Sequence, residues 1–299
     1  MADARDLDFT YTQIDRLFRL SIGEMGDFSG ALYDGDFSLT LEQAQRRKHE
    51  YIAASLGIGP GKRVLDLGCG WGGFLRFARE LGATGVGVTL SRGQAAACRR
   101  NGLDVHRMDG RALRPEDLGR FDAVVSLGAF EHFCSREDYE AGRQDAVYAG
   151  VFRAMHGLLP EGGGFFLQTM VFGRNMIPPE QIDAHAKPRS DAHALAAMAA
   201  QFPGSWLPFG PEQVERSAEP RFRLVSAVSG RIDYIETIRQ WERRFGAFSL
   251  RKLLVLLSLA PRWLTQPRFR LGFTAGYSAN TVCFQRELLD HFRFVFERR

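Results

Sequence analysis

The sequence has few cysteines, no long apolar run and no large excess of either charge. Its four cysteines, Cys69, Cys98, Cys134 and Cys283, lie far apart and form no Cys-x-x-Cys pair, which argues against a zinc site and against a disulfide framework. The longest largely apolar run, Leu253 to Ala260, is too short to cross a bilayer. We therefore expect a protein of the reducing cytoplasm.

Charge and composition also exclude several classes of protein. Lys and Arg number 39 against 35 Asp and Glu, so the formal net charge is only +4, and no basic stripe with interleaved aromatics is present. We therefore expect no nucleic-acid partner. The first ten residues, "MADARDLDFT", contain acidic side chains and no apolar stretch, which predicts neither a signal peptide nor a transit sequence.

What the sequence does contain is an alternation of short apolar runs with helical stretches. The strand-like runs are "RVLDLG", "GVGVTL", "DVHRMDG", "FDAVVSLGAF" and "GGFFLQTMVF", followed later by "FRLVSAVSG" and a final "NTVCFQREL". Strands separated by helices predict an α/β fold with a parallel sheet that is covered on both faces. We expect a helical cap over residues 1–57 and a main domain over 58–299, with a lid-like insertion at 173–211 and a second substrate-side insertion at 234–270.

The first strand-like run ends in a carboxylate and a glycine-rich turn. Asp66 is followed by Gly68, Gly70 and Gly72, which lets a ligand approach the backbone. The dinucleotide fingerprint is only approximated, and the next run ends in Thr-Leu-Ser at 89–91 rather than in the acidic residue that would bind a ribose. A carboxylate at position 66 suits the ammonium group of a methionine moiety, so these residues favour S-adenosylmethionine over a dinucleotide.

Several motifs together resemble a known family. "VLDLGCGWGG" resembles motif I of class I S-adenosylmethionine-dependent methyltransferases. With "GVTLSRGQ", "SLGAFEHF", "FPGSWLP" and "YIETIRQW", the chain resembles the cyclopropane fatty acid synthase family, which includes the mycolic acid methyltransferases. The similarity runs from about Phe28 to Glu287. It implies a class I methyltransferase fold, a Rossmann-like sheet with helices on both faces.

The resemblance implies a set of contacts to S-adenosylmethionine. They fall at the methionine end, the ribose, the adenine and the sulfonium neighbourhood. The implied residues, with Asp66 included, are Phe28, Ser29, Asp66, Gly68, Gly70, Gly72, Thr89, Leu90, Gln94, Asp109, Gly110 and Leu127.

The resemblance also implies a catalytic centre, but only in part. In the family a bicarbonate ion acts as the base, held by a cysteine backbone, a glutamate, a histidine and a tyrosine. Glu131 and Tyr234 match two of these positions, whereas Gly30 stands at the cysteine position and Gln168 at the histidine position. The backbone amide of Gly30 and the side-chain amide of Gln168 can still bind an anion. Alternatively, Glu131 is itself the base.

The expected activity is methyl transfer to an alkene carbon of an unsaturated fatty acyl lipid or a similar apolar acceptor, giving a cyclopropane, methyl or methylene product. Three alternatives stay open: a small-molecule C-, N- or O-methyltransferase, a non-catalytic S-adenosylmethionine-binding subunit, and a nicotinamide dehydrogenase. Basic residues such as Arg251 and Lys252 beside the apolar run suit a membrane surface or an acidic carrier protein. We interpret His132 as structural and expect no metal, because His185 and His193 lack further ligands at suitable spacing.

Overall fold

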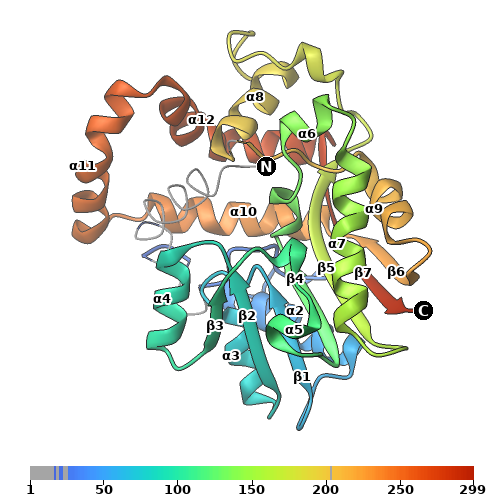
Figure 1. Ribbon diagram of the computed structural model, residues 1–299. Coiled ribbons are helices and arrows are strands. Elements are labelled where there is room, and N and C mark those ends of the chain that lie inside the picture. The colour runs from blue at the N-terminus through green and yellow to red at the C-terminus, as the bar shows by residue number, and fades with distance from the viewer. Residues whose placement is uncertain (1–16, 18–19, 23–25, 203) are drawn as a thin grey trace.

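A seven-stranded sheet forms the centre of the protein (Figure 1), with strand order β3-β2-β1-β4-β5-β7-β6. The computed structural model describes residues 17, 20–22, 26–202 and 204–299. The strands are β1 (Arg63–Leu67), β2 (Thr84–Thr89), β3 (Asp104–Arg107), β4 (Ala123–Leu127), β5 (Gly164–Phe172), β6 (Phe222–Ser229) and β7 (Leu289–Arg298).

Helices alternate with the strands and also form the region above the sheet. The longer ones are α2 (Leu41–Leu56), α3 (Gly73–Glu80), α4 (Arg92–Arg100), α7 (Gln144–Leu158), α8 (Asp191–Gln201), α9 (Gly210–Ala218), α10 (Arg231–Gly246), α11 (Leu250–Thr265) and α12 (Pro267–Gln285). The shorter ones are η1 (Gly110–Ala112), α5 (Pro115–Leu118), η2 (Phe130–His132), α6 (Arg136–Glu140) and η3 (Pro179–Gln181).

The strand order creates a crevice at one edge of the sheet. β1 pairs in parallel with both β2 and β4, while β2 pairs in parallel with β3, and β4 with β5. The chain therefore reverses direction across the sheet between β1 and β4, and ligands bind outside the carboxyl ends of the strands at such a point. The predicted Rossmann-like α/β fold is confirmed. The sheet is mixed rather than wholly parallel, because β7 runs antiparallel to both β5 and β6.

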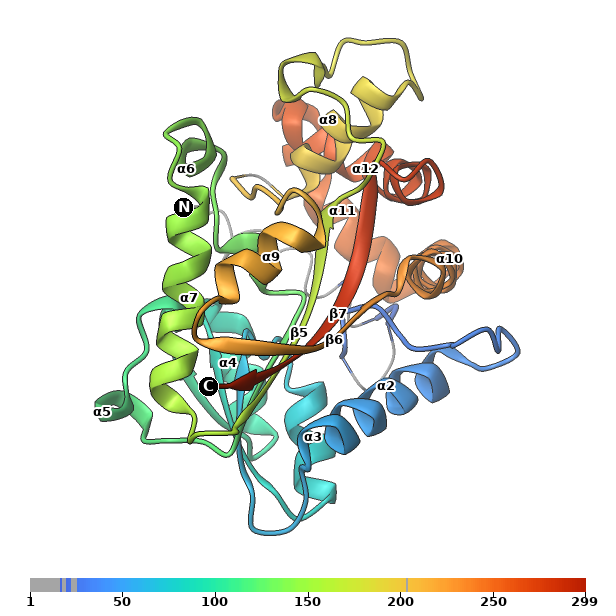
Figure 2. The same cartoon turned by 90° about the vertical axis from the view of Figure 1, so that its right-hand side faces the viewer.

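Apolar layers pack on both faces of the sheet. Figure 2 shows α2, α3 and α10 on one side and α7 and α9 on the other. On the α7 side, Phe152 packs edge-on against Phe165 and Phe296, with ring centroids 5.7 and 5.2 Å apart. All three rings are buried. Replacing such a phenylalanine by alanine costs about 3–5 kcal/mol of folding free energy.

Helix α2 is bounded by a capping box at its start and a glycine at its end. Thr40 accepts a hydrogen bond from the Gln43 backbone, and the Gln43 side chain accepts one from the Thr40 backbone, which is the capping box that the Thr-x-x-Gln spacing favours. Gly57 ends the helix in the left-handed conformation. This helix brings Lys48 and His49 underneath the segment that begins at residue 26, as described below.

The predicted strand at "NTVCFQREL" is wrong. Its first six residues, 280–285, belong to α12, and the last strand is β7. Asn280, Cys283 and Phe284 are buried, at helical spacing. A short apolar run cannot be distinguished as strand or helix by periodicity alone, and here tertiary packing decided for helix.

The upper part of the molecule in Figure 1 contains α8, α11 and α12, together with α6. Helix α8, in the 173–211 segment, packs on α12. Helix α11 projects from the body at the left of Figure 1. Part of the predicted cap falls on residues outside the described ones, and the division into a cap and a main domain stays a prediction.

Candidate active site

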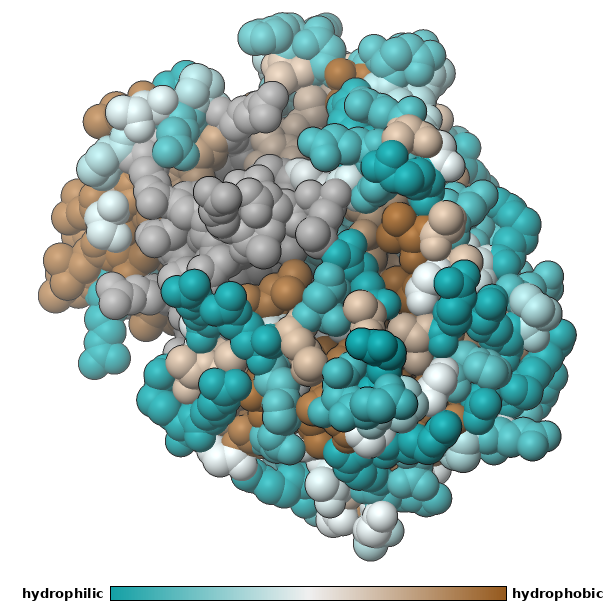
Figure 3. Space-filling view, viewed as in Figure 1, coloured by the Kyte–Doolittle hydropathy of each residue, from teal (hydrophilic) through white to brown (hydrophobic). Residues whose placement is uncertain are grey.

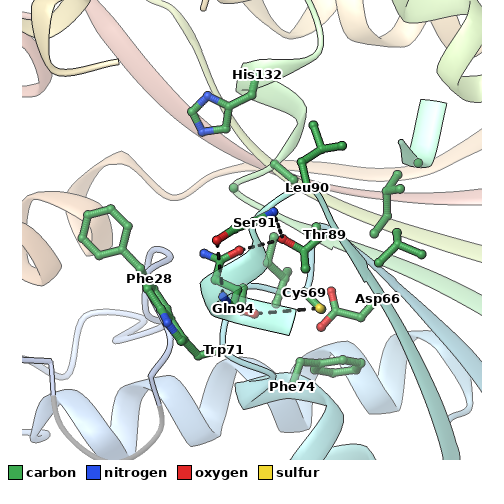
Figure 4. Close-up of a pocket in the computed structure, with 18 of the residues that line it drawn as sticks. Phe28, Asp66, Cys69, Trp71, Phe74, Thr89, Leu90, Ser91, Gln94 and His132 are labelled. Carbon is green, nitrogen blue, oxygen red and sulfur yellow. Dashed lines mark hydrogen bonds between the residues drawn. The ribbon is translucent and has the colours of Figure 1, made fainter. Parts of the chain in front are cut away.

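A pocket lies at the carboxyl ends of β1, β2 and β4 (Figure 4). Ten of the twelve predicted cofactor-binding residues line it. They are Phe28, Asp66, Gly68, Gly70, Thr89, Leu90, Gln94, Asp109, Gly110 and Leu127. Ser29 and Gly72 do not line it. We call this the donor pocket.

Asp66 is a buried carboxylate at the end of β1. Its side chain makes no hydrogen bond to another residue in the described part of the chain, and it lines the donor pocket. Burial, together with the nearby charge of Asp27, raises the pKa of the Asp66 carboxyl to about 8, although Lys48 opposes the shift. A cationic group of a ligand would supply the partner that this carboxylate lacks.

A second carboxylate, which the sequence analysis missed, lies beside the first. Asp27 lines the same pocket and contacts two cationic or hydrogen-bonding groups of α2, with Lys48 Nζ at 2.6 Å and His49 Nε2 at 2.8 Å. Burial would raise the pKa of Asp27, but the Lys48 ammonium and His49 outweigh it and hold that pKa well below its ordinary value. With Asp66, this end of the pocket holds two carboxylates against one buried ammonium group.

Ser29 contributes to the same network from outside the pocket lining. Its hydroxyl donates a hydrogen bond to Asp27 Oδ1 at 2.6 Å, and Lys48 Nζ donates to that hydroxyl at 2.6 Å. The Gln45 side chain also donates to the Ser29 backbone carbonyl at 2.8 Å. Ser29 therefore fastens the 26–29 segment to α2, which keeps Asp27 and Phe28 at the pocket.

The glycine-rich turn follows β1 in left-handed backbone conformations. Gly68, Gly70 and Gly72 have φ values of 83°, 52° and 79°. A Cβ atom at Gly72 would also lie 2.4 Å from Leu103 Cδ1. Gly72 thus permits close packing under the turn, while Gly68 and Gly70 line the pocket.

The ends of β2 and β3 supply polar groups at the far side of the pocket. Thr89 Oγ1 donates to Gln94 Oε1 at 2.7 Å, and Ser91 caps α4 by accepting from the Gln94 backbone at 3.3 Å. Asp109 caps η1 and pairs with Arg111, which lowers the pKa of its carboxyl even though burial opposes this. These bonds fix the side chains that the resemblance assigns to ribose and adenine.

A second pocket adjoins the donor pocket and is almost entirely apolar. It is formed by η2, β5, the 173–211 insertion and the start of β7. Its lining residues are Glu131, His132, Met170, Phe172, Ile182, Leu195, Met198, Ala199, Phe202, Ser205, Trp206, Leu207 and Leu289. We call this the acceptor pocket. Apolar side chains of the insertion therefore wall a cavity.

Glu131 is the one carboxylate among the described residues that line the acceptor pocket. The Met170 backbone N–H donates to its Oε1 at 2.9 Å, while its Oε2 is buried without a partner among the described residues. Burial raises the pKa of the Glu131 carboxyl to about 7, although the Met170 hydrogen bond opposes the shift. A carboxyl group that titrates near neutral pH is suited to proton transfer.

His132 lines both pockets, which the sequence analysis did not anticipate. Its Nδ1 lies 2.8 Å from Ser205 Oγ in the insertion. Burial lowers the pKa of the His132 imidazole to about 4, so the ring is neutral at physiological pH. In Figure 4 it lies at the opposite end of the donor pocket from Asp66. Its position next to Glu131 in the sequence was the available signal.

The three other predicted catalytic residues form a buried cluster that lines neither pocket. Gln168 Nε2 donates to the Gly30 carbonyl oxygen at 3.0 Å. A Cβ atom at Gly30 would lie 2.7 Å from Tyr234 Cδ2. The structure thus brings Gly30, Gln168 and Tyr234 together, and the roles given to them stay predictions.

Comparison with known proteins gives the family. A family profile described as "Mycolic acid cyclopropane synthetase" matches residues 1–254. The chain belongs to this family. Cyclopropane mycolic acid synthase 3 of Mycobacterium tuberculosis (strain CDC 1551 / Oshkosh) is 31% identical over 241 residues, which are 77% of this chain and 78% of that protein. The predicted resemblance is confirmed.

Solved structures agree with this assignment. The cyclopropane synthase MmaA2 from Mycobacterium tuberculosis has a TM-score of 0.75 and 25% identity, with 99% of this chain and 98% of that chain covered. The mycolic acid cyclopropane synthase CmaA1, solved with SAH and CTAB, shares the fold at a TM-score of 0.74 and 24% identity, with the same shares covered. As a member of the mycolic acid cyclopropane synthetase family, the chain has the predicted class I methyltransferase fold.

Proposed function

We propose that the chain transfers a methyl group from S-adenosylmethionine to an alkene carbon of an unsaturated fatty acyl lipid. The observation that carries this proposal is the junction of the two pockets, because His132 lines both and Glu131 faces the apolar one. A polar donor pocket next to an apolar acceptor pocket suits a charged methyl donor and an oily acceptor. Family membership supports the same activity.

The donor pocket fits S-adenosylmethionine at its methionine end. Asp66 lacks a hydrogen-bond partner among the described residues, and Asp27 lies beside it. An ammonium group there would relieve the repulsion between the two carboxylates. When bound, S-adenosylmethionine supplies an electrophilic methyl group on a positively charged sulfur.

The chain's own residues then have separate tasks. The turn at Gly68 and Gly70 and the capped ends of β2 and β3 orient the donor, and positioning of this kind supplies much of the rate in a methyl transfer. Phe172, Phe202 and Trp206 in the acceptor pocket exclude water and offer aromatic faces to a developing cation. Glu131 accepts the proton that the product must lose.

The direct test is product formation with matched lipids. We would incubate the protein with S-adenosylmethionine and a phospholipid that carries a cis-monounsaturated chain, its saturated counterpart, or small-molecule acceptors. The proposal expects release of S-adenosylhomocysteine and a lipid enlarged by one methylene or methyl unit with the unsaturated lipid alone. Turnover with small acceptors only would support the small-molecule methyltransferase, and no turnover with any acceptor would support a non-catalytic subunit.

We also propose that α11 binds the surface of an anionic membrane. Apolar side chains that project from this helix are exposed and recur at helical spacing. They include Leu250 (65% exposed), Leu254 (61%), Leu257 (60%) and Leu264 (67%). Figure 3 shows apolar side chains gathered over α11 at the left of the molecule. No helix of the described residues is long and apolar enough to span a membrane.

The charge of the surrounding sequence favours an anionic surface as the partner. From Arg243 to Arg286 the sequence carries eight Arg and Lys residues and no Asp or Glu. Each basic residue near an anionic leaflet contributes about 1 kcal/mol, and each leucine withdrawn from water roughly 1.5–3 kcal/mol. A helix with exposed leucines in a purely basic segment therefore suits the interface of a bilayer that contains acidic phospholipids.

Vesicle sedimentation tests this surface. The protein should sediment with phosphatidylglycerol vesicles more than with phosphatidylcholine vesicles, and added salt should release it. Leu254→Glu should weaken sedimentation, whereas Val225→Glu, at another exposed apolar position on β6, should not. Equal binding of both variants would contradict the assignment to α11. If the protein bound an acidic carrier protein but no vesicles, the carrier protein rather than the membrane would be the partner of α11.

A further inference from the structure

Gly30 leaves a space that two aromatic rings fill. A Cβ atom at this position would lie 2.7 Å from Tyr234 Cδ2 and 2.8 Å from His291 Cε1, closer than real Cβ atoms approach other atoms. The two rings stack on each other, with centroids 4.6 Å apart and planes 1° apart. A side chain at position 30 would therefore meet both the Tyr234 and the His291 ring.

His291 lies on the same face of the sheet as the acceptor pocket. It is directly opposite Met170 in the β5–β7 pairing, as Leu289 is opposite Phe172. Met170, Phe172 and Leu289 all line the acceptor pocket. Because alternate residues of a strand share a face, His291 is the next residue beyond Leu289 on that face. The imidazole thus lies on that face of the sheet opposite Met170, although His291 does not itself line the pocket.

The His291 ring is neutral and incompletely paired. It is buried, and its Nδ1 has no hydrogen-bond partner among the described residues. Burial, followed by the charges of Arg293 and Lys48, lowers the pKa of the His291 imidazole well below its ordinary value. Both of those cations are already paired, Arg293 with Asp233 at 2.9 Å and Lys48 with Asp27 at 2.6 Å.

Two unpaired oxygen atoms of the residues assigned to bicarbonate do not suit an anion. The Gly30 carbonyl needs an N–H donor, which fixes the orientation of the Gln168 amide and leaves Gln168 Oε1 as the unpaired atom. Glu131 Oε2 is also unpaired among the described residues, as is His291 Nδ1. Gln168 Oε1 and Glu131 Oε2 are hydrogen-bond acceptors, and they would repel a bicarbonate ion. With the Tyr234 and His291 rings filling the space beside Gly30, the residues that the resemblance assigns to bicarbonate do not fit it in this chain.

We infer that this chain works without a bound bicarbonate, because His291 and Tyr234 occupy the space beside Gly30 and Glu131 takes the proton itself. The inference rests on the proposed function. A C–H bond near the cationic carbon breaks, its electron pair closes the three-membered ring or forms a double bond, and the proton goes to the ionised Glu131 carboxylate. His291 is a positioning residue that holds the space closed.

The first test is the response of turnover to bicarbonate. Wild-type turnover of the unsaturated phospholipid should be the same in buffer depleted of carbon dioxide and in buffer with added bicarbonate at equal pH and ionic strength. A fall of tenfold or more on depletion, about 1.4 kcal/mol in the barrier, would overturn the inference. A wild-type protein that turns over no unsaturated lipid would instead contradict the proposed function.

Opening the space should create the response that the wild type lacks. His291→Ala leaves a cavity beside Gly30 within the field of Arg293 and Lys48, so added bicarbonate should raise its turnover, whereas the wild type should not respond. Leu289→Ala removes an apolar side chain from the same face and should show no bicarbonate response. An unresponsive His291→Ala, or a response in both variants, would contradict the role given to His291.

A stability measurement tests the packing independently of activity. Gly30→Ala should destabilise the wild-type fold, because its methyl group meets the two rings. In the His291→Ala background the same substitution should destabilise less, since one ring has been removed. Thermal unfolding of the wild type, the two single variants and the double variant gives the coupling free energy between positions 30 and 291. An equal destabilisation by Gly30→Ala in both backgrounds would show that Gly30 does not make room for His291.

Discussion

The two pockets differ in how the chain builds them. The donor pocket is made largely from continuous stretches that follow β1 and β2, and it holds the buried carboxylates Asp27 and Asp66. The acceptor pocket is assembled from η2, β5, the 173–211 insertion and β7, and its lining is almost wholly apolar. Recognition of the donor is thus a local property of the sequence, whereas the shape of the acceptor pocket depends on packing between distant segments.

The largest expected loss of turnover comes from changing Glu131, because this residue gives the apolar acceptor pocket its reactive group. Glu131→Gln keeps the size of the side chain but removes the base, so turnover should fall by at least about a hundredfold, within the range of about 10²–10⁴ for general base catalysis. Affinity for S-adenosylhomocysteine should stay nearly the same. Glu137→Gln, at an exposed position on α6, is the matched control. Full activity of Glu131→Gln would remove this residue from the mechanism.

A change at Asp66 should affect binding of the donor, in contrast to the change at Glu131, which should affect turnover. Asp66→Asn should weaken S-adenosylhomocysteine binding about ten- to a hundredfold, since a hydrogen bond to a charged group contributes roughly 1.5–3 kcal/mol. The unliganded variant should also melt at a higher temperature. The folded-state pKa of about 8 lies above the ordinary 3.8, so ionisation of Asp66 destabilises the unliganded fold progressively as pH rises through this range.

Calorimetric titration and thermal melts at pH 8 measure both effects of Asp66→Asn. Asp104→Asn, at an exposed position, is the control. If Asp66→Asn bound S-adenosylhomocysteine as tightly as the wild type, the Asp66 carboxylate would not contribute to donor binding.

Narrowing the acceptor pocket should affect the acceptor and not the donor. Ala199 lines this pocket and is exposed on α8, so a larger side chain there should be tolerated by the fold. Ala199→Phe should lower turnover of long-chain lipids roughly tenfold, in keeping with about 1–3 kcal/mol for overpacking, without changing S-adenosylhomocysteine binding. Ala192→Phe, elsewhere on α8, should have little effect. An equal loss in both variants would mean that the pocket does not hold the acyl chain.

The smallest expected effect is a pH dependence of donor binding. Because Asp66 must be ionised to pair with an ammonium group, affinity for S-adenosylhomocysteine should rise with pH, by about fivefold between pH 7 and 8 for a pKa near 8. Asp66→Asn should abolish this rise. A flat profile in the wild type would show that the pocket binds the donor without this carboxylate.

Sequence reasoning worked where function depends on consecutive residues. The turn after Asp66, the capping box at Thr40 and the βα alternation were all predictable because each depends on local spacing. The helix at 280–285 was not, since its apolar run satisfies strand and helix equally and contact with α8 decided the outcome.

The candidate site shows the same limit. Glu131 could be predicted from a motif, but its proximity to an apolar cavity could not. His291 lies far from every motif in the sequence; the antiparallel pairing of β7 with β5 places it opposite Met170, and its ring stacks on that of Tyr234 of α10. Asp27 was missed for a similar reason, because its importance comes from Lys48 and His49 on a separate helix.

The most direct measurement is a crystal structure with S-adenosylhomocysteine and a bound unsaturated fatty acyl chain. The account predicts the amino group of the nucleoside ligand at Asp66, its sulfur turned towards the junction at His132, and the double bond in the acceptor pocket beside Glu131. A sulfur atom directed away from that junction, or an acyl chain outside the pocket, would contradict it.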